Sequence, residues 1–111
     1  MRYSVVTLNR DYLFGRAYKS KHYFVSPVVV TYVVPKKSGG IRVGITSSKK
    51  IGCAVQRNRA RRVVRAAAFP LLKDAVGSFD VVFVCRSSTA SSKSTDLSVI
   101  IRDHLTRAGV L

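Results

Sequence analysis

The sequence predicts a single α+β domain, a small β-sheet packed with helices in the order α-β-β-α-β-α. The chain has 111 residues, which suits one hydrophobic core because domains commonly hold about 100–150 residues. Hydrophobic residues make up 47% of the chain, as in folded rather than disordered proteins. Segments with the period of a strand alternate with segments that have the period of a helix. We therefore expect residues 1–111 to form one domain.

The first half of the chain predicts one helix and two strands. Asn9–Tyr18 is expected to be a short helix, which Asn9 or Asp11 can cap. Val25–Val34 is rich in β-branched and aromatic residues, and Ile41–Thr46 alternates apolar with polar residues, so both segments are expected to be strands. The Pro-, Lys- and Gly-containing turn between them predicts that they pair as a hairpin.

The second half predicts a helix, a strand and a closing helix. Ala54–Phe69 is the strongest helical segment, and Pro70 marks its expected end or a kink. Phe79–Cys85 is almost continuously apolar, which is typical of a strand covered on both faces. Leu97–Ala108 carries an apolar stripe at helical spacing, and Gly109 is expected to end that helix.

The charge of the chain points to a polyanionic partner. It holds 20 Lys and Arg against 5 acidic residues, a net charge of +15, and such a domain repels itself without a counter-charge. Nucleic acid is the expected partner, and an anionic membrane surface is the alternative. The longest apolar run, Val28–Val34, is far shorter than the ~20 residues of a membrane span. The N-terminus does not read as a signal peptide, so a cytoplasmic protein is expected.

The residues that usually carry catalysis or bind metals are sparse. All five acids are Asp, and no pair of carboxylates or Ser-His-Asp arrangement is evident. Cys53 and Cys85 fit no zinc-ligand spacing; Cys85 is expected to be buried, and Cys53 could be mildly reactive. His22 and His104 are expected to be surface or packing residues. We predict no catalytic residue and no metal site on the protein.

A basic segment carries the functional signal. Seven of the 17 residues of Lys49–Arg65 are basic and none is acidic. On a helical wheel Arg57, Arg61 and Arg65 form one stripe with Asn58 and Arg62 beside it, and the opposite face holds Ala60, Val63, Val64 and Ala67. Like charges four residues apart cost about 0.2–0.5 kcal/mol per pair, so the stripe does not serve stability. Arginine grips phosphate oxygens with two parallel donors, which makes an RNA backbone the expected counter-ion.

Aromatic residues suggest a second contact with nucleic acid. Phe14 and Tyr18 lie four residues apart on the first predicted helix, and Tyr32 lies on the first predicted strand. They could stack unpaired bases, at about 1–3 kcal/mol per base. The alternative is an aromatic cluster that holds the helix on the sheet.

The basic segment resembles the signature of the protein subunit of bacterial ribonuclease P. That signature has a Lys-Lys pair, a glycine, Ala-Val-x-Arg-Asn-Arg and further basic residues, here Lys49, Lys50, Gly52, Ala54, Val55, Arg57, Asn58, Arg59, Arg61, Arg62 and Arg65. The aromatic pair near the N-terminus, Tyr32, Arg42-Val43-Gly44-Ile45 and Asp80-Val81-Val82 followed by Arg86 agree with it. The resemblance covers nearly all of residues 8–108.

The resemblance implies a fold and a function. The fold is a ribosomal protein S5 domain 2-like sandwich with a left-handed βαβ crossover. The catalytic RNA would be bound by Lys49, Lys50, Arg57, Asn58, Arg59, Arg61, Arg62 and Arg65, and the 5′ leader of precursor tRNA by Phe14, Tyr18 and Tyr32. The RNA would cleave off the leader with magnesium held mainly on the RNA, and no protein partner would be required. The departures are Ala66-Ala67-Ala68, where the family often has charged residues, and Lys21, where many relatives have glycine.

Two other functions remain open from the residues alone. A ribosomal or other structural RNA-binding protein would share the charge and the basic helix. A helix-turn-helix DNA regulator fits less well, because the basic helix is expected to lie between strands rather than beside a second helix.

Overall fold

The computed structural model describes residues 6–7, 23–35, 40–47, 51–73, 75 and 77–110. Within these ranges the strands are β1 (Val6–Thr7), β2 (Tyr23–Val25), β3 (Val29–Pro35), β4 (Ile41–Thr46) and β5 (Phe79–Cys85). The helices are α2 (Ala54–Leu72), the short 3-10 helix η2 (Thr89–Ser91) and α3 (Ser94–Arg107). The α+β class is confirmed, whereas the predicted helix Asn9–Tyr18 lies outside the described residues.

The five strands form one sheet in the order β1-β4-β5-β3-β2. Strand β5 lies between β3 and β4, antiparallel to β3 and parallel to β4. The predicted hairpin of Val25–Val34 with Ile41–Thr46 is therefore wrong, because β3 and β4 are not neighbours. Val81, Val82 and Phe83 of β5 are fully buried, so this strand is covered on both faces, as its apolar run predicts, and its central place separates the other two.

The single strand predicted over Val25–Val34 is two strands. Between β2 and β3 the chain reverses at Ser26, whose backbone N–H donates to the Val29 carbonyl at 3.0 Å. The Ser26 hydroxyl in turn accepts the Val29 N–H at 3.0 Å. A Ser-Pro pair inside a β-rich segment is the turn signal that marks this break. As a result β2 folds back on β3 with Tyr23 opposite Tyr32.

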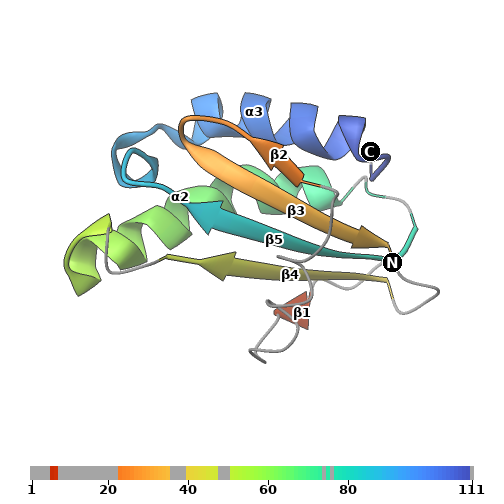
Figure 1. Cartoon of the computed structure of the whole chain (residues 1–111), viewed down its shortest axis with the longest axis horizontal. Coiled ribbons are helices and arrows are strands. Elements are labelled where there is room, and N and C mark those ends of the chain that lie inside the picture. Colours follow the sequence, from red (N-terminus) through yellow and green to blue (C-terminus); the bar gives the residue numbers. More distant parts are fainter. Residues whose placement is uncertain are drawn as a thin grey trace.

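The connection from β4 through α2 to β5 has the handedness that such crossovers rarely adopt. In Figure 1 both strands run to the left, β5 lies above β4, and α2 passes behind the sheet, which makes the crossover left-handed. General chain rules favour the right-handed form in about 98% of such units. The left-handed form was expected here only from the family resemblance, and it is confirmed.

Helices α2 and α3 cover one face of the sheet. Alternate residues of three strands point into the core beneath them, namely Val29, Val33, Ile41, Val43, Val81 and Phe83. The buried residues of α2 are Ala60, Val64, Ala67, Ala68, Leu71 and Leu72. The helix passes through Pro70 and ends later than predicted. The carbonyl that loses a donor there, that of Ala66, lies on an exposed part of the helix where water can hydrogen-bond it.

Helix α3 is held on the sheet by a polar and aromatic contact as well as by its apolar stripe. His104 is buried, and its Nδ1 lies 2.8 Å from the hydroxyl of Thr31 on β3. Its ring stacks on Phe24 of β2 at 5.8 Å, and the Arg107 guanidinium lies 5.2 Å from the centre of the same phenyl ring. Burial lowers the pKa of His104, so the imidazole is a neutral packing residue, one of the two roles expected for it.

Candidate nucleic-acid interface

The start of α2 is shaped by a glycine and a glutamine. Gly52 has φ +139°, a conformation that side chains disfavour, and a methyl group there would overlap the Gln56 amide. The Gln56 Oε1 accepts the Cys53 N–H at 3.1 Å, which satisfies one free donor at the helix start. The family glycine at this position therefore has a local structural reason, while Lys49 and Lys50 lie outside the described residues.

The two cysteines have opposite surroundings. Cys53 is exposed, and hydrogen bonds from the backbone of Gln56 and Val55 lower the pKa of its thiol. Cys85 is buried in β5, and burial raises the pKa of its thiol to about 11. Cys85 is thus an inert core residue, as expected, and Cys53 is an accessible thiol at the edge of the basic helix.

The arginines of α2 spread over a wider arc than the wheel predicts. Arg59, Arg62 and Arg65 are exposed, whereas Arg57 and Arg61 are half-buried. The stripe of Arg57, Arg61 and Arg65 does not point directly away from the core, and that part of the prediction is wrong. Each of its members precedes a buried residue by three positions, namely Ala60, Val64 and Ala68, so the stripe borders the packed face. Arg62 and Asn58 lie further out.

Arg61 fixes the orientation of two neighbours. One of its terminal nitrogens donates to the Ser47 hydroxyl at 2.7 Å, which ties α2 to the end of β4. The other donates to the Oδ1 of Asn58, so the amide nitrogen of Asn58 remains a free donor directed away from Arg61. Ser47 was not among the predicted site residues, and nothing in its sequence context identifies it.

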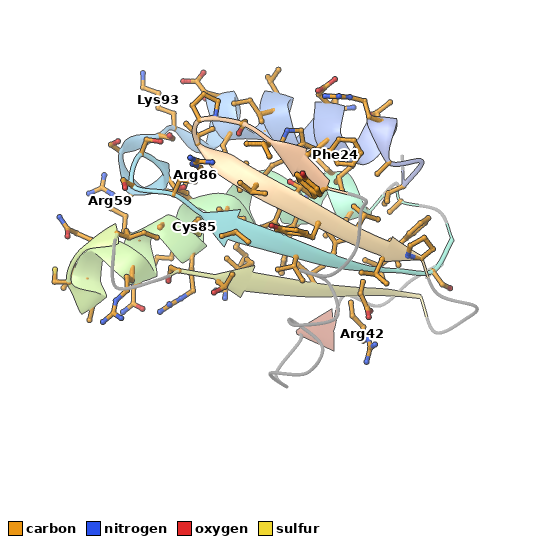
Figure 2. All side chains as sticks on the ribbon, in the orientation of Figure 1. Phe24, Arg42, Arg59, Cys85, Arg86 and Lys93 are labelled. Carbon is orange, nitrogen blue, oxygen red and sulfur yellow. The ribbon has the colours of Figure 1, made fainter. Side chains whose placement is uncertain are left out.

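Carboxylates do not neutralise this helix in the part of the chain that the structure describes. Asp80 pairs with Arg42, and Asp103 pairs with Arg107 on α3. Figure 2 shows Arg59 at the same end of the molecule as Arg86 and Lys93, from the segment between β5 and α3. These basic residues extend the positive surface beyond α2.

The outer surface of α2 is slightly hollowed. Val55, Asn58, Arg59 and Arg62 line a depression of about 370 Å³. Val55 is 75% exposed, so an apolar side chain lies among hydrogen-bond donors on this surface. A surface that mixes guanidinium groups, an amide and an apolar side chain can contact phosphate, base edge and ribose together.

The other face of the sheet carries the predicted aromatic residue Tyr32. It alternates with Thr31 and Val33, which point toward the helices, so Tyr32 points away from them. Its ring lies 5.6 Å from the ring of Tyr23 across the β2–β3 pair. Phe14 and Tyr18 lie outside the described residues. Tyr23, half exposed, was not singled out from the sequence, because its pairing with Tyr32 depends on the turn at Ser26.

Neither a membrane-spanning helix nor a metal-ligand cluster occurs in the described ranges. No helix there is long and apolar enough to cross a membrane. No group of three or more His, Cys, Asp or Glu residues among the described positions could hold a metal ion.

A small α+β fold with an exposed helix that is rich in arginine and holds no acidic residue is typical of a nucleic-acid-binding protein. Residues 4–109 match the protein family described as Ribonuclease P. The ribonuclease P protein component of Clostridioides difficile is 32% identical over 104 residues, which cover 93% of this chain and 91% of that protein. The corresponding protein of Dehalococcoides mccartyi strain 195 is 31% identical, with 94% and 85% covered. The structure of the Staphylococcus aureus RNase P protein superposes with a TM-score of 0.80 at 26% identity, covering 96% of this chain and 98% of that one.

The chain therefore belongs to the ribonuclease P protein family. It is a subunit of the ribonuclease P holoenzyme, which cleaves precursor tRNA, and its partner is the RNase P RNA. The alternative of a ribosomal or other structural RNA-binding protein is not favoured by these comparisons.

Proposed function

We propose that the α2 surface docks on the catalytic RNA and that the face of the sheet away from α2 and α3, which carries Tyr32, binds the 5′ leader of precursor tRNA. The residues that we assign to the RNA subunit are Lys49, Lys50, Arg57, Asn58, Arg59, Arg61, Arg62 and Arg65. The observation that supports this most is the exposure of Arg59, Arg62 and Arg65 without a carboxylate partner among the described residues. Phe14 and Tyr18 are assigned to the leader by resemblance alone.

The protein's contribution is electrostatic and geometric. Its cations reduce the repulsion between two RNA molecules and so favour the bound state. Magnesium, which activates the attacking water and stabilises developing charge in phosphodiester hydrolysis, is proposed to be held mainly by the RNA. The protein would act in the cytoplasm, where precursor tRNA is processed, and needs no further protein partner.

The proposal is tested by cleavage of precursor tRNA in a magnesium titration. The purified chain, added to its cognate catalytic RNA, is expected to lower the magnesium concentration required for cleavage. Cations on the protein replace part of the screening that magnesium otherwise supplies. A cleavage curve that is the same with and without the protein, over the whole range of magnesium and salt, would refute it.

Tyr32 offers a test of the leader-binding face. Tyr32→Leu is expected to weaken binding of leader-bearing precursor tRNA to the holoenzyme by about 10-fold, since one stacked base contributes about 1–3 kcal/mol. Binding of mature tRNA should change little, and Tyr32→Phe, which keeps the ring, should behave as the wild type. Equal losses for precursor and mature tRNA would instead make Tyr32 a packing residue of the sheet.

A further inference from the structure

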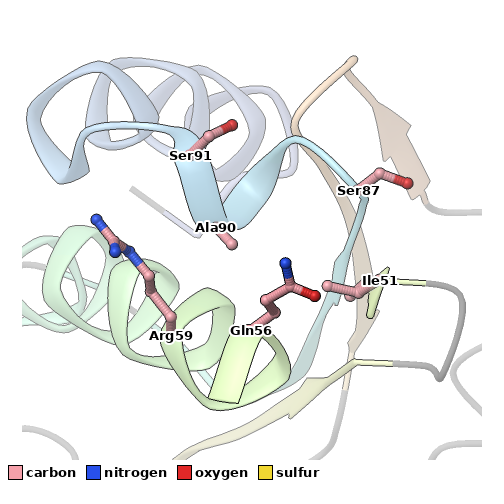
Figure 3. A pocket seen from close by; sticks show the side chains of 6 residues that line it. All are labelled: Ile51, Gln56, Arg59, Ser87, Ala90 and Ser91. Atoms are coloured by element: carbon pink, nitrogen blue, oxygen red, sulfur yellow. The ribbon is translucent and has the colours of Figure 1, made fainter. Parts of the chain in front are cut away.

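We propose that a hollow between the start of α2 and η2 receives one unpaired nucleotide of the RNA that the protein binds (Figure 3). This α2–η2 hollow is lined by Ile51, Gln56, Arg59, Ser87, Ala90 and Ser91. The inference rests on the proposed function, which supplies the RNA. It assigns a role to the segment after β5, which the arginine helix alone does not explain.

The hollow is open to solvent and is large enough to hold one base. Its volume is about 430 Å³, within the range of about 300–1,000 Å³ that small-ligand sites occupy. Ile51 and Ala90 are both half-buried and pack against the main core, so they form an apolar floor. Arg59 and Gln56 stand on the α2 side, and Ser87 and Ser91 flank Ala90 on the other side with their hydroxyls turned away from Gln56 (Figure 3).

The Gln56 amide is oriented so that a donor faces the hollow. Its oxygen is used by the Cys53 N–H, and Figure 3 shows the amide nitrogen on the side toward Ala90. The NH₂ group can therefore donate to a carbonyl oxygen or ring nitrogen on the edge of a base. A base that rests on Ile51 and Ala90 would place such an edge near Gln56.

The wall formed by η2 is held in place before any ligand binds. Thr89 is buried, and its hydroxyl donates to the Val28 carbonyl. The same oxygen accepts the Arg86 N–H at 2.7 Å, and the Ser91 and Ser92 hydroxyls both donate to the Ser88 carbonyl. Because these bonds pin the segment to the turn before β3 and to itself, binding there costs little ordering of the chain.

Charge selects a nucleotide over other occupants. Arg59 lines both this hollow and the depression on the outer surface of α2, so its guanidinium can hold the phosphate that follows a base in the hollow. None of the residues that line the hollow is acidic. An apolar floor, a base-edge donor and a phosphate-binding cation together match an unstacked nucleotide, whereas a free phosphate would use Arg59 alone.

Filling the hollow tests the proposal. Ala90→Leu is expected to weaken binding of the catalytic RNA or of precursor tRNA by about 10-fold, because the larger side chain keeps a base off the apolar floor and its buried contacts are lost. The dependence of affinity on salt should keep its slope, because every phosphate stays bound to its cation. Thr106→Leu, which adds a leucine on the exposed side of α3, is the matched control. Separate titrations of the catalytic RNA, and of precursor tRNA on the assembled holoenzyme, identify which RNA supplies the nucleotide.

A second variant keeps the test informative if Ala90→Leu disturbs η2. Gln56→Glu retains an oxygen for the Cys53 N–H but loses the amide donor, and Thr106→Glu adds the same charge on α3. We expect about a 10-fold loss only for Gln56→Glu, because the base edge would be taken out of water without its donor. In NMR titrations with the four nucleoside 5′-monophosphates, the Gln56 side-chain amide signals should shift, and inorganic phosphate should not shift them.

The possible outcomes separate this inference from the proposed function. If wild-type protein fails to assist cleavage, the proposed function fails. If it assists cleavage but Ala90→Leu and Gln56→Glu bind both RNAs as their controls do, the hollow is not a nucleotide site. Gln56 amide signals that shift with inorganic phosphate as much as with nucleotides would reduce the hollow to an anion site.

Discussion

Replacing Arg42 by methionine is expected to lower the free energy of unfolding by about 3–5 kcal/mol, the usual cost of removing one partner from a buried ion pair. Arg42 Nε donates to Asp80 Oδ1 at 2.8 Å, and Arg42 Nη2 donates to Asp80 Oδ2 at 2.9 Å. The side chain of Asp80 is 3% exposed and that of Arg42 31% exposed. Loss of the guanidinium removes two charge-assisted bonds from a carboxylate that water scarcely reaches.

The two residues stand opposite each other in the parallel β4–β5 pair, near the start of both strands. They lie on the face away from α2 and α3, because Val43 and Val81 beside them point into the main core. The pair thus joins the two strands that the α2 crossover connects. Urea unfolding of the wild type and of Arg42→Met measures its contribution.

A double variant separates charge burial from packing. Arg42→Met combined with Asp80→Leu leaves neither charge behind, and such apolar replacements are often neutral or stabilising. The double variant is therefore expected to be more stable than Arg42→Met alone, which is informative even if the single variant fails to fold. A cost below about 1 kcal/mol for Arg42→Met is typical of a solvent-exposed pair and would contradict this account of the sheet.

Local patterns in the sequence predicted the elements better than their arrangement. The apolar run of β5 correctly indicated a strand covered on both faces, and Ala60, Val64 and Ala67 pack where the helical period places them. The hairpin was wrong because adjacency in sequence is only a default for pairing. Insertion of β5 between β3 and β4 is decided by which strand can be buried on both faces, a property of the whole sheet.

For the functional surface too, some features could be predicted from the sequence and others depend on the fold. The density of arginine and the lack of carboxylates are visible in the sequence, as is the family signature. The half-burial of Arg61 is not, because its partner, the Ser47 hydroxyl, lies 14 positions earlier in the chain and only the fold brings the two together. The α2–η2 hollow also escaped prediction, since it joins residues about 35 positions apart, such as Gln56 and Ser91, that only the fold brings together.

Removing Arg62 and Arg65 together is expected to weaken binding of the catalytic RNA by 10-fold or more, with little effect on folding. Both side chains are exposed, and no contact with a carboxylate of the described residues holds them. The slope of log affinity against log salt should become shallower by about 0.7–0.9 for each phosphate that the variant no longer neutralises. Filter binding between about 50 and 200 mM salt, where this term is large, measures the slope.

Stability should move in the opposite direction from binding. Arg65 lies four residues after Arg61, and relief of such a like-charge pair gains about 0.2–0.5 kcal/mol, while alanine is the best helix former. The double alanine variant should therefore unfold at the same urea concentration as the wild type or at a higher one. A variant that lost both RNA binding and stability would show that these arginines hold the fold rather than the RNA.

The lower net charge of the double variant could by itself weaken RNA binding. A matched variant separates this effect from the loss of local phosphate contacts. Lys73→Ala with Arg102→Ala removes the same two charges from the far end of α2 and from α3, where both residues are exposed. If contact with phosphate is local, this control keeps the wild-type salt slope, because only cations that touch the RNA release counter-ions from it. Equal slopes for the two double variants would mean that the protein attracts RNA by its overall charge and that α2 forms no defined interface.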